Sequence, residues 1–391
     1  MKFQFSDLSS LYFGIVLIIF FGILTQIRNK PTSAALIVVV TPLYLALILA
    51  TGSYIFNLPD ADYFLGAAFF TMASVGLCSF GFFTYFSRKD GETLLRAVIA
   101  VLTVNAILVL MMFISPQIQG NYLNLLSESN FELLGGSDNA LDSMHRFRMV
   151  GATGFATYSA GFTQTIGLFF LAAYYYLANK KLNLLFLIIA VLLAISAVLA
   201  ARSSFLGIIL WSIFCAIFFG RHFVVIFVGL VILIVSIMLV LITLSGEVGG
   251  DFFSNWLLEL FTSGTRTESL TETVQMLNTP FMDSGLYGFS RWYGDLGYDY
   301  FRSADVGYIR LILAGGFATL FFIVLHFLLL GLLFFRGTYI VFFRTLYYFL
   351  MVYFFIIMFK GAILFDFFAF DFLMLMLAWI ANQNKTIVKI T

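Results

Sequence analysis

Residues 182–220 read LNLLFLIIAVLLAISAVLAARSSFLGIILWSIFCAIFFG. Two apolar runs, 182–200 and 203–220, are separated by a short turn that contains Arg202. A helix of about 20 apolar residues crosses the roughly 30 Å hydrocarbon core of a bilayer. Both runs are apolar on every side, whereas the strands of a membrane barrel alternate between apolar and polar residues. This stretch therefore predicts two membrane-spanning helices joined by a tight turn.

Similar runs fill the rest of the chain. Hydrophobic residues make up 62% of its 391 residues and charged residues 10%, whereas average soluble domains are about 25% charged. We therefore predict an all-α polytopic membrane protein, with residues 1–391 forming one transmembrane domain. The first run lacks a small-residue cleavage site, so we expect a retained helix. About eleven spans are predicted, at 8–27, 33–56, 63–86, 94–115, 155–178, 182–200, 203–220, 222–244, 306–335, 339–359 and 362–381.

The charges of the loops predict the orientation. On one side the loops are rich in lysine and arginine, and their only acids are Asp90 and Glu92. Because cytoplasmic loops carry the basic excess, we place this side in the cytoplasm, with the N-terminus outside and the C-terminus inside. The basic residues of this side are Arg28, Lys30, Arg88, Lys89, Arg96, Lys180, Lys181, Arg221, Arg336, Arg344, Lys385 and Lys389.

The opposite side carries arginines that this rule does not explain. Its only lysines are Lys2 and Lys360. The planar guanidinium group matches phosphate oxygens in pairs, so an excess of arginine over lysine indicates an anionic ligand. For Arg202 the alternative is a side chain that anchors the turn at the membrane surface. The seven outer arginines are Arg146, Arg148, Arg202, Arg266, Arg291, Arg302 and Arg310.

Two outer loops are long, at 116–147 and 245–304. The second is predicted to be partly helical, because residues 265–268 form a capping box of the S/T-x-x-E type. Residues 283–300 of this loop are rich in Gly, Tyr and Trp with interspersed Asp and Arg. Aromatic faces beside charged groups favour contact with a sugar. An interfacial aromatic belt is the alternative.

Acidic and basic residues lie close together in the sequence at the start of the ninth span. Arg302 and Asp305 lie three positions apart, so a helix would bring them to one face, and Arg310 lies deeper. One interpretation is an ion pair at a helix start. The other is a carboxylate beside phosphate-binding arginines.

The sequence lacks the motifs of several other chemistries. It has no phosphate loop, no G-x-G-x-x-G and no G-x-S-x-G. The three histidines form no metal-binding cluster. Asp60 and Asp62 form a D-x-D pair, which we interpret as a solvated loop. We therefore expect no metal, no cofactor and no nucleic-acid partner.

Four short stretches resemble the O-antigen polymerase (Wzy) family of the O-antigen polymerase and ligase superfamily. They are RMVGATG at 148–154, ARSS at 201–204, GTR at 264–266 with DSGLYG at 283–288, and DVGY at 305–308 with GG at 315–316. Ligases of this superfamily usually carry a His-Asn pair where this chain has Asp305 and Val306, so the resemblance favours a polymerase over a ligase.

The resemblance implies a GT-C-like fold with a large periplasmic loop in the bacterial inner membrane. It implies a metal-independent glycosyltransferase that moves a glycan from undecaprenyl diphosphate onto a lipid-linked repeat unit. A chain-length regulator and a flippase are the expected protein partners. The alternatives are an O-antigen ligase and a lipid-linked sugar flippase, although a flippase needs charge along a central path and here the charges gather at one face.

On this interpretation one carboxylate takes the proton of the acceptor hydroxyl. Asp305 is the first candidate, followed by Asp299, Asp295 and Asp142. Arg202, Arg266 and Arg310 would bind the departing diphosphate. Further substrate contacts are expected at Arg148, Arg291, Arg302, Tyr308, Trp292 and Asp299.

Overall fold

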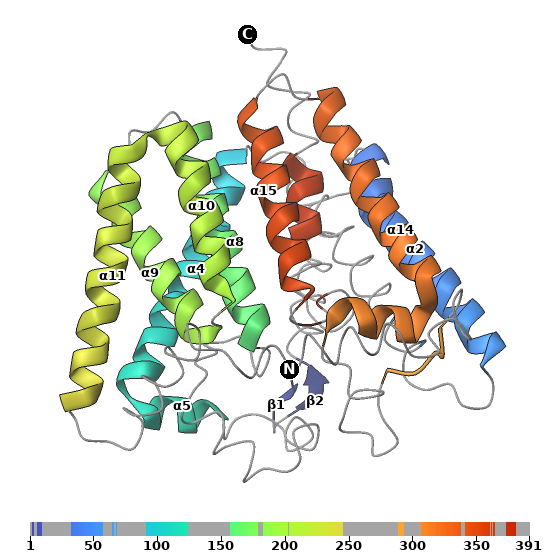
Figure 1. Cartoon of the computed structure of the whole chain (residues 1–391), viewed down its shortest axis with the longest axis horizontal. Helices are drawn as coiled ribbons and strands as arrows, with labels where there is room; N and C mark the ends of the chain where they lie inside the picture. Colours follow the sequence, from blue (N-terminus) through green and yellow to red (C-terminus); the bar gives the residue numbers. More distant parts are fainter. Residues whose placement is uncertain are drawn as a thin grey trace. The chain divides into compact units, whose positions relative to one another are not determined.

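The computed structural model is almost entirely helical in the residues that it describes (Figure 1). Two short N-terminal strands, β1 (Lys2–Phe3) and β2 (Ser6–Ser9), pair with each other. Residues 8–9 of the first predicted span belong to β2. The described residues are 2–3, 6–9, 33–57, 65, 68, 91–123, 157–178, 183–201, 203–244, 288–292, 306–337, 341–359, 361, 363 and 373–380.

The described helices follow the apolar runs of the sequence. Eight of the predicted spans coincide with a helix to within about three residues at each end, the usual uncertainty of such boundaries. Short α5 opens the first long loop. The helices are α2 (Ser33–Phe56), α4 (Gly91–Ile114), α5 (Pro116–Leu123), α8 (Thr157–Leu177), α9 (Leu184–Ala200), α10 (Ser204–Phe219), α11 (Arg221–Leu244), α14 (Gly307–Gly337) and α15 (Val341–Ile357).

Three stretches of these helices are long and apolar enough to cross a membrane: Ile37–Phe56, Glu92–Ile114 and Gly307–Leu332. Four further stretches are apolar but shorter, at 10–17 residues: Leu184–Ala200, Ser204–Phe219, Arg221–Leu233 and Val341–Ile357. These features support the prediction of an α-helical membrane protein. Most of the predicted spans 8–27 and 63–86 lies outside the described residues, and of 362–381 residues 373–380 are helical.

We expected one transmembrane domain, and the contacts within the chain divide it into two compact units. The first unit contains α4, α5, α8, α9, α10 and α11. The second contains α2, α14 and most of α15. In residues, the first unit is Met1–Asp7, Glu92–Leu270 and Phe349–Tyr353, and the second is Leu8–Gly91, Thr271–Tyr348 and Phe354–Thr391.

The core of the first unit is built by α8, which packs against α9 and α10, while α11 packs against both of these. Glycines allow the close approach of α8 and α10. A Cβ at Gly161 of α8 would collide with the side chain of Ser204 in α10, and a Cβ at Gly207 of α10 would collide with the side chain of Thr165 in α8. The indole of Trp211 donates to the carbonyl of Leu168 at 2.7 Å. Small residues at a helix crossing are typical of membrane bundles.

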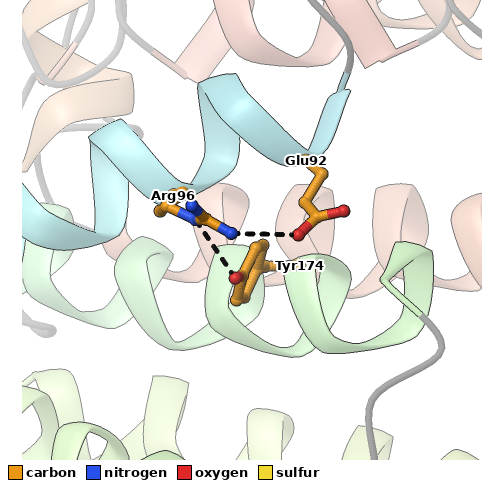
Figure 2. Close-up of polar contacts among 3 residues, drawn as sticks. All are labelled: Glu92, Arg96 and Tyr174. Atoms are coloured by element: carbon orange, nitrogen blue, oxygen red, sulfur yellow. Dashed lines mark hydrogen bonds and ion pairs between the residues drawn. The ribbon is translucent and has the colours of Figure 1, made fainter.

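A cluster of three polar side chains, Glu92, Arg96 and Tyr174, joins the start of α4 to the last turns of α8 (Figure 2). Arg96 of α4 donates to the hydroxyl of Tyr174 at 3.3 Å and forms a 3.2 Å ion pair with Glu92. Asn183 caps α9 by accepting from the amide of Phe186 at 2.9 Å. The exposed ion pair of Arg96 with Glu92 contributes little to stability. Arg96, Tyr174 and Asn183 all lie near the span ends for which the loop charges predict a cytoplasmic location.

In the second unit α14 packs along α2. Tyr347 of α15 donates to the carbonyl of Phe327 in α14 at 2.6 Å. His326 of α14 is buried, and its Nε2 lies 3.3 Å from the sulfur of Met374. Tyr347 and His326 are therefore each matched by a group from another part of this unit.

Candidate functional site

Helix α14 is broken near its start. Gly316 has φ 73° and ψ −178°, a conformation outside the helical region. Figure 1 shows the two parts of α14 running in different directions. An irregular backbone at membrane depth needs hydrogen-bond partners from neighbouring protein groups. The carbonyl of Gly315 accepts from the Thr319 hydroxyl at 2.6 Å.

The carbonyls of the preceding turn are bonded to groups from elsewhere in the second unit. The amide of Phe289 donates to the carbonyl of Leu313 at 2.7 Å, and the amide of Ser290 donates to that of Ala314 at 2.9 Å. The Ser53 hydroxyl of α2 also donates to the Ala314 carbonyl, at 2.9 Å. Helix α2 and the 288–292 segment thus bond the backbone exposed by the break.

The 288–292 segment lies directly against the break because Gly288 allows it. Gly288 has φ 69°, and a Cβ there would lie 2.6 Å from the amide nitrogen of Gly316. The side-chain amide of Asn57 donates to the carbonyls of Gly288, at 2.9 Å, and of Ser53, at 2.7 Å. Phe289 packs against the buried cluster that contains Ile309. The segment is therefore fixed by backbone bonds, side-chain bonds and apolar packing.

A buried cation lies beside this segment. The guanidinium carbon of Arg310 lies 3.9 Å from the ring centroid of Trp292. Arg310 is 3% exposed and Trp292 is fully buried. A cation over an indole face is attracted by about 0.5–2 kcal/mol, more when the pair is desolvated. The guanidinium carries its N–H donors in a rigid fork, a geometry that matches the oxygens of a carboxylate or phosphate.

Tyr308 joins α14 to α15. Its hydroxyl donates to the carbonyl of Phe355 at 2.7 Å, and its ring meets the ring of Phe359 edge-on at 4.9 Å. The hydroxyl is thus bonded to the backbone of α15, and Tyr308 fixes the first turn of α14. Its predicted contact with substrate stays a prediction.

The structure brings together Arg310 and Trp292, which the sequence predicted as site residues. Arg291 belongs to the same segment as Trp292, whereas the side chain of Tyr308 contacts Phe355 and Phe359. The contacts around the break in α14 also involve residues that were not predicted from the sequence to make them: Ser53, Asn57, Gly288, Ser290 and Gly316. Polar residues near the end of an apolar span and paired glycines inside one were the available signals. The predicted site residues outside the described part of the chain are Asp305, Arg202, Arg266, Arg148, Arg302 and Asp299. The loops 116–147 and 245–304 are described only at 116–123 and 288–292.

The residues of these contacts share one predicted side of the membrane, and that orientation stays a prediction. Asn57, the 288–292 segment, Tyr308 and Phe355 are all near span ends or loops that the charge pattern assigns to the outer side. These parts meet in one place within the second unit. Among the described residues, no group of three or more His, Cys, Asp or Glu side chains could hold a metal ion.

The helices and this cluster define the class: an α-helical protein with helices of membrane-crossing length, one of which is broken beside a buried arginine. No family model, no curated protein and no solved structure matches the chain.

Proposed function

We propose that the protein is a metal-independent membrane glycosyltransferase that polymerises lipid-linked repeat units. It transfers a glycan from undecaprenyl diphosphate onto a second lipid-linked unit at the periplasmic face of the bacterial inner membrane. The observation that carries this proposal is the buried Arg310, held over Trp292 beside the break in α14. The four short stretches that resemble O-antigen polymerases supply the substrate class.

A buried arginine at the end of a membrane helix is costly unless it has a partner or a function. The indole of Trp292 offsets part of the lost hydration. An anionic ligand would add hydrogen bonds in which both groups are charged, and these are the stronger kind. Broken helices in other membrane proteins serve the same purpose, because they place ionic groups where the backbone is irregular.

In the proposed reaction a hydroxyl of the acceptor sugar attacks the anomeric carbon of the donor. The bond from that carbon to the diphosphate oxygen breaks, and the lipid diphosphate leaves with the electron pair. Arg310 would stabilise the charge that develops on this oxygen, as preorganised donors do. Arg202 and Arg266 are proposed to act with it, and Asp305 is proposed to take the hydroxyl proton.

The first test is a gel of surface polysaccharide from the source strain with the gene deleted. Core that carries a single repeat unit, without the ladder of longer chains, is the result expected for a polymerase. Bare core with long glycan retained on the lipid carrier would instead indicate a ligase. Bare core with single lipid-linked units trapped on the cytoplasmic side would indicate a flippase.

The second test complements the deletion with Arg310 variants. Loss of one charge-stabilising donor typically slows such a step about 100- to 1000-fold, so Arg310→Ala should abolish the ladder. Arg310→Lys keeps the charge but not the fork of donors, and it should restore only short chains. Arg96→Ala is the matched control, because this arginine lies exposed in the cluster of polar side chains of Figure 2. A full ladder from well-folded Arg310→Ala protein would end the proposal.

A further inference from the structure

Ser290 has a backbone conformation that serine rarely adopts. Its φ is 53°, and it is the one non-glycine residue with a positive φ in the described part of the chain. Residues held in this region store strain, and such strain gathers at ligand sites and switches. The hydrogen bond from its amide to the Ala314 carbonyl, at 2.9 Å, holds the backbone in place.

The hydroxyl of Ser290 is a second unfavourable feature of this residue, in addition to its backbone strain. The residue is fully buried, and its Oγ has no hydrogen-bond partner within the described residues. A buried hydroxyl without a partner is unfavourable, because it has lost water and gained nothing. A glycine at this position would remove both the strain and the unpaired hydroxyl. A ligand with an acceptor at this hydroxyl would supply the missing partner.

The position of Ser290 indicates which partner this is. Its amide bonds to Ala314, which lies four residues after Arg310 and therefore on the same face of α14. Trp292, two residues further along the same segment, lies under the Arg310 guanidinium. Ser290 and Trp292 therefore belong to one segment, which contacts α14 at Ala314 and at Arg310, about one helical turn apart.

We infer that the Ser290 hydroxyl donates a hydrogen bond to a phosphate oxygen of the ligand that Arg310 binds. The inference rests on the proposed function and deepens it, because it assigns a second and uncharged donor to the diphosphate site. A hydroxyl that donates to an ionised oxygen forms a short, charge-assisted bond. Ser290 is a binding residue in this arrangement, and its fixed backbone orients the hydroxyl before the ligand arrives.

The test measures binding of farnesyl diphosphate to the purified full chain in detergent, by titration and by the shift in melting temperature. Ser290→Gly removes the hydroxyl and accepts the backbone conformation. It should weaken binding about tenfold or more, as expected for a lost bond to a charged group, while the unliganded protein melts no lower than the wild type. Ser290→Ala removes the hydroxyl and keeps the strain, and it should weaken binding equally. Ser212→Ala is the matched control, because that hydroxyl donates to Ile208 within α10.

Three results would overturn the inference. The first is wild-type affinity in Ser290→Gly while Arg310→Ala has lost binding, which would leave the proposed function standing. The second is weaker binding together with a lower melting temperature of the unliganded Ser290→Gly protein, which would assign the hydroxyl a structural role. The third is absence of farnesyl diphosphate binding by the wild type, and the deletion gel then decides separately whether the proposed function also fails.

Discussion

Two pairs of glycines, one pair in each unit, have opposite roles. In the first unit, Gly161 and Gly207 lie within continuous helices, where the missing side chain lets a neighbouring helix or ring come close. In the second unit, Gly288 and Gly316 have positive φ, and the missing side chain frees the backbone itself. The first use keeps every backbone bond inside its helix. The second exposes carbonyls that α2 and the 288–292 segment must bond.

This difference indicates where a ligand site can form. A tightly crossed pair of continuous helices offers a ligand few backbone or charged groups. A broken helix offers irregular backbone, and membrane proteins accept such backbone where it is buried in protein or lines a cavity. Arg310 and Ser290 both lie beside the break. A series of substitutions can test whether the two uses of glycine differ as described.

The largest loss of stability is expected for Gly288→Ala. Its Cβ would lie 2.6–2.8 Å from backbone atoms of 313–316, and its φ is positive. Strain and overpacking together should cost roughly 3 kcal/mol or more of unfolding free energy, measured by denaturant titration in detergent micelles. Gly288→Asn is the control, since asparagine tolerates this φ but carries the same Cβ. If Gly288→Asn proved as stable as the wild type, the close approach to Gly316 would be disproved.

A smaller loss is expected for Gly207→Ala in the first unit. The new methyl would meet the side chain of Thr165 and the ring of Tyr353, which stacks on Phe162 with centroids 5.3 Å apart. These are side chains rather than backbone, so they can shift, and the cost should be about 1–3 kcal/mol. The same titration measures it. A loss greater than that of Gly288→Ala would reverse the order that the two uses of glycine predict.

Asn57→Ala should cost less again. The substitution removes two donated hydrogen bonds, to the carbonyls of Ser53 and Gly288. Each is worth on the order of 1 kcal/mol, and the half-buried position admits some water in exchange. The substitution should also make the 288–292 segment more mobile, because one hydrogen bond that holds it is lost. Faster proteolysis at this segment in Asn57→Ala than in the Gly207→Ala protein would support this, and equal rates would count against it.

The smallest effect, with the opposite sign, is expected for Gly229→Ala in α11. No atom lies within 4 Å of a Cβ at this position. The only consequence is then the higher helix propensity of alanine, which stabilises a helix by up to about 1 kcal/mol. Unfolding in the same micelles provides the measurement. A clear loss of stability would mean that α11 has a neighbour at Gly229.

The positions of the helices could be predicted from the sequence, because a run of about 20 apolar residues has few other stable forms in a membrane. The break in α14 could not. The run 306–335 is apolar on both sides of Gly316, and one bond that makes the break tolerable comes from Ser53, 261 positions away from Ala314.

The candidate site was predicted in part. Arg310 and Trp292 were singled out by residue type, since arginines are unusual on the outer side and aromatic residues gather in the large loop. Their mutual contact depends on how the 288–292 segment lies against α14, and no local pattern encodes that. The strained backbone of Ser290 could not be predicted from the sequence, because it depends on the hydrogen bond to Ala314, which is distant along the chain.

The break also shortens the straight part of α14 to a length that matches the thickness of a bilayer. With 31 residues, an unbroken α14 would measure about 46 Å at 1.5 Å per residue, well beyond the roughly 30 Å of hydrocarbon. Residues 317–337 alone would measure about 31 Å. The residues before Gly316 are thus not needed for the crossing and can lie in the headgroup layer. Tyr308 and Arg310 then avoid the bilayer centre, where a charge costs most, and the helix needs no strong tilt to relieve hydrophobic mismatch.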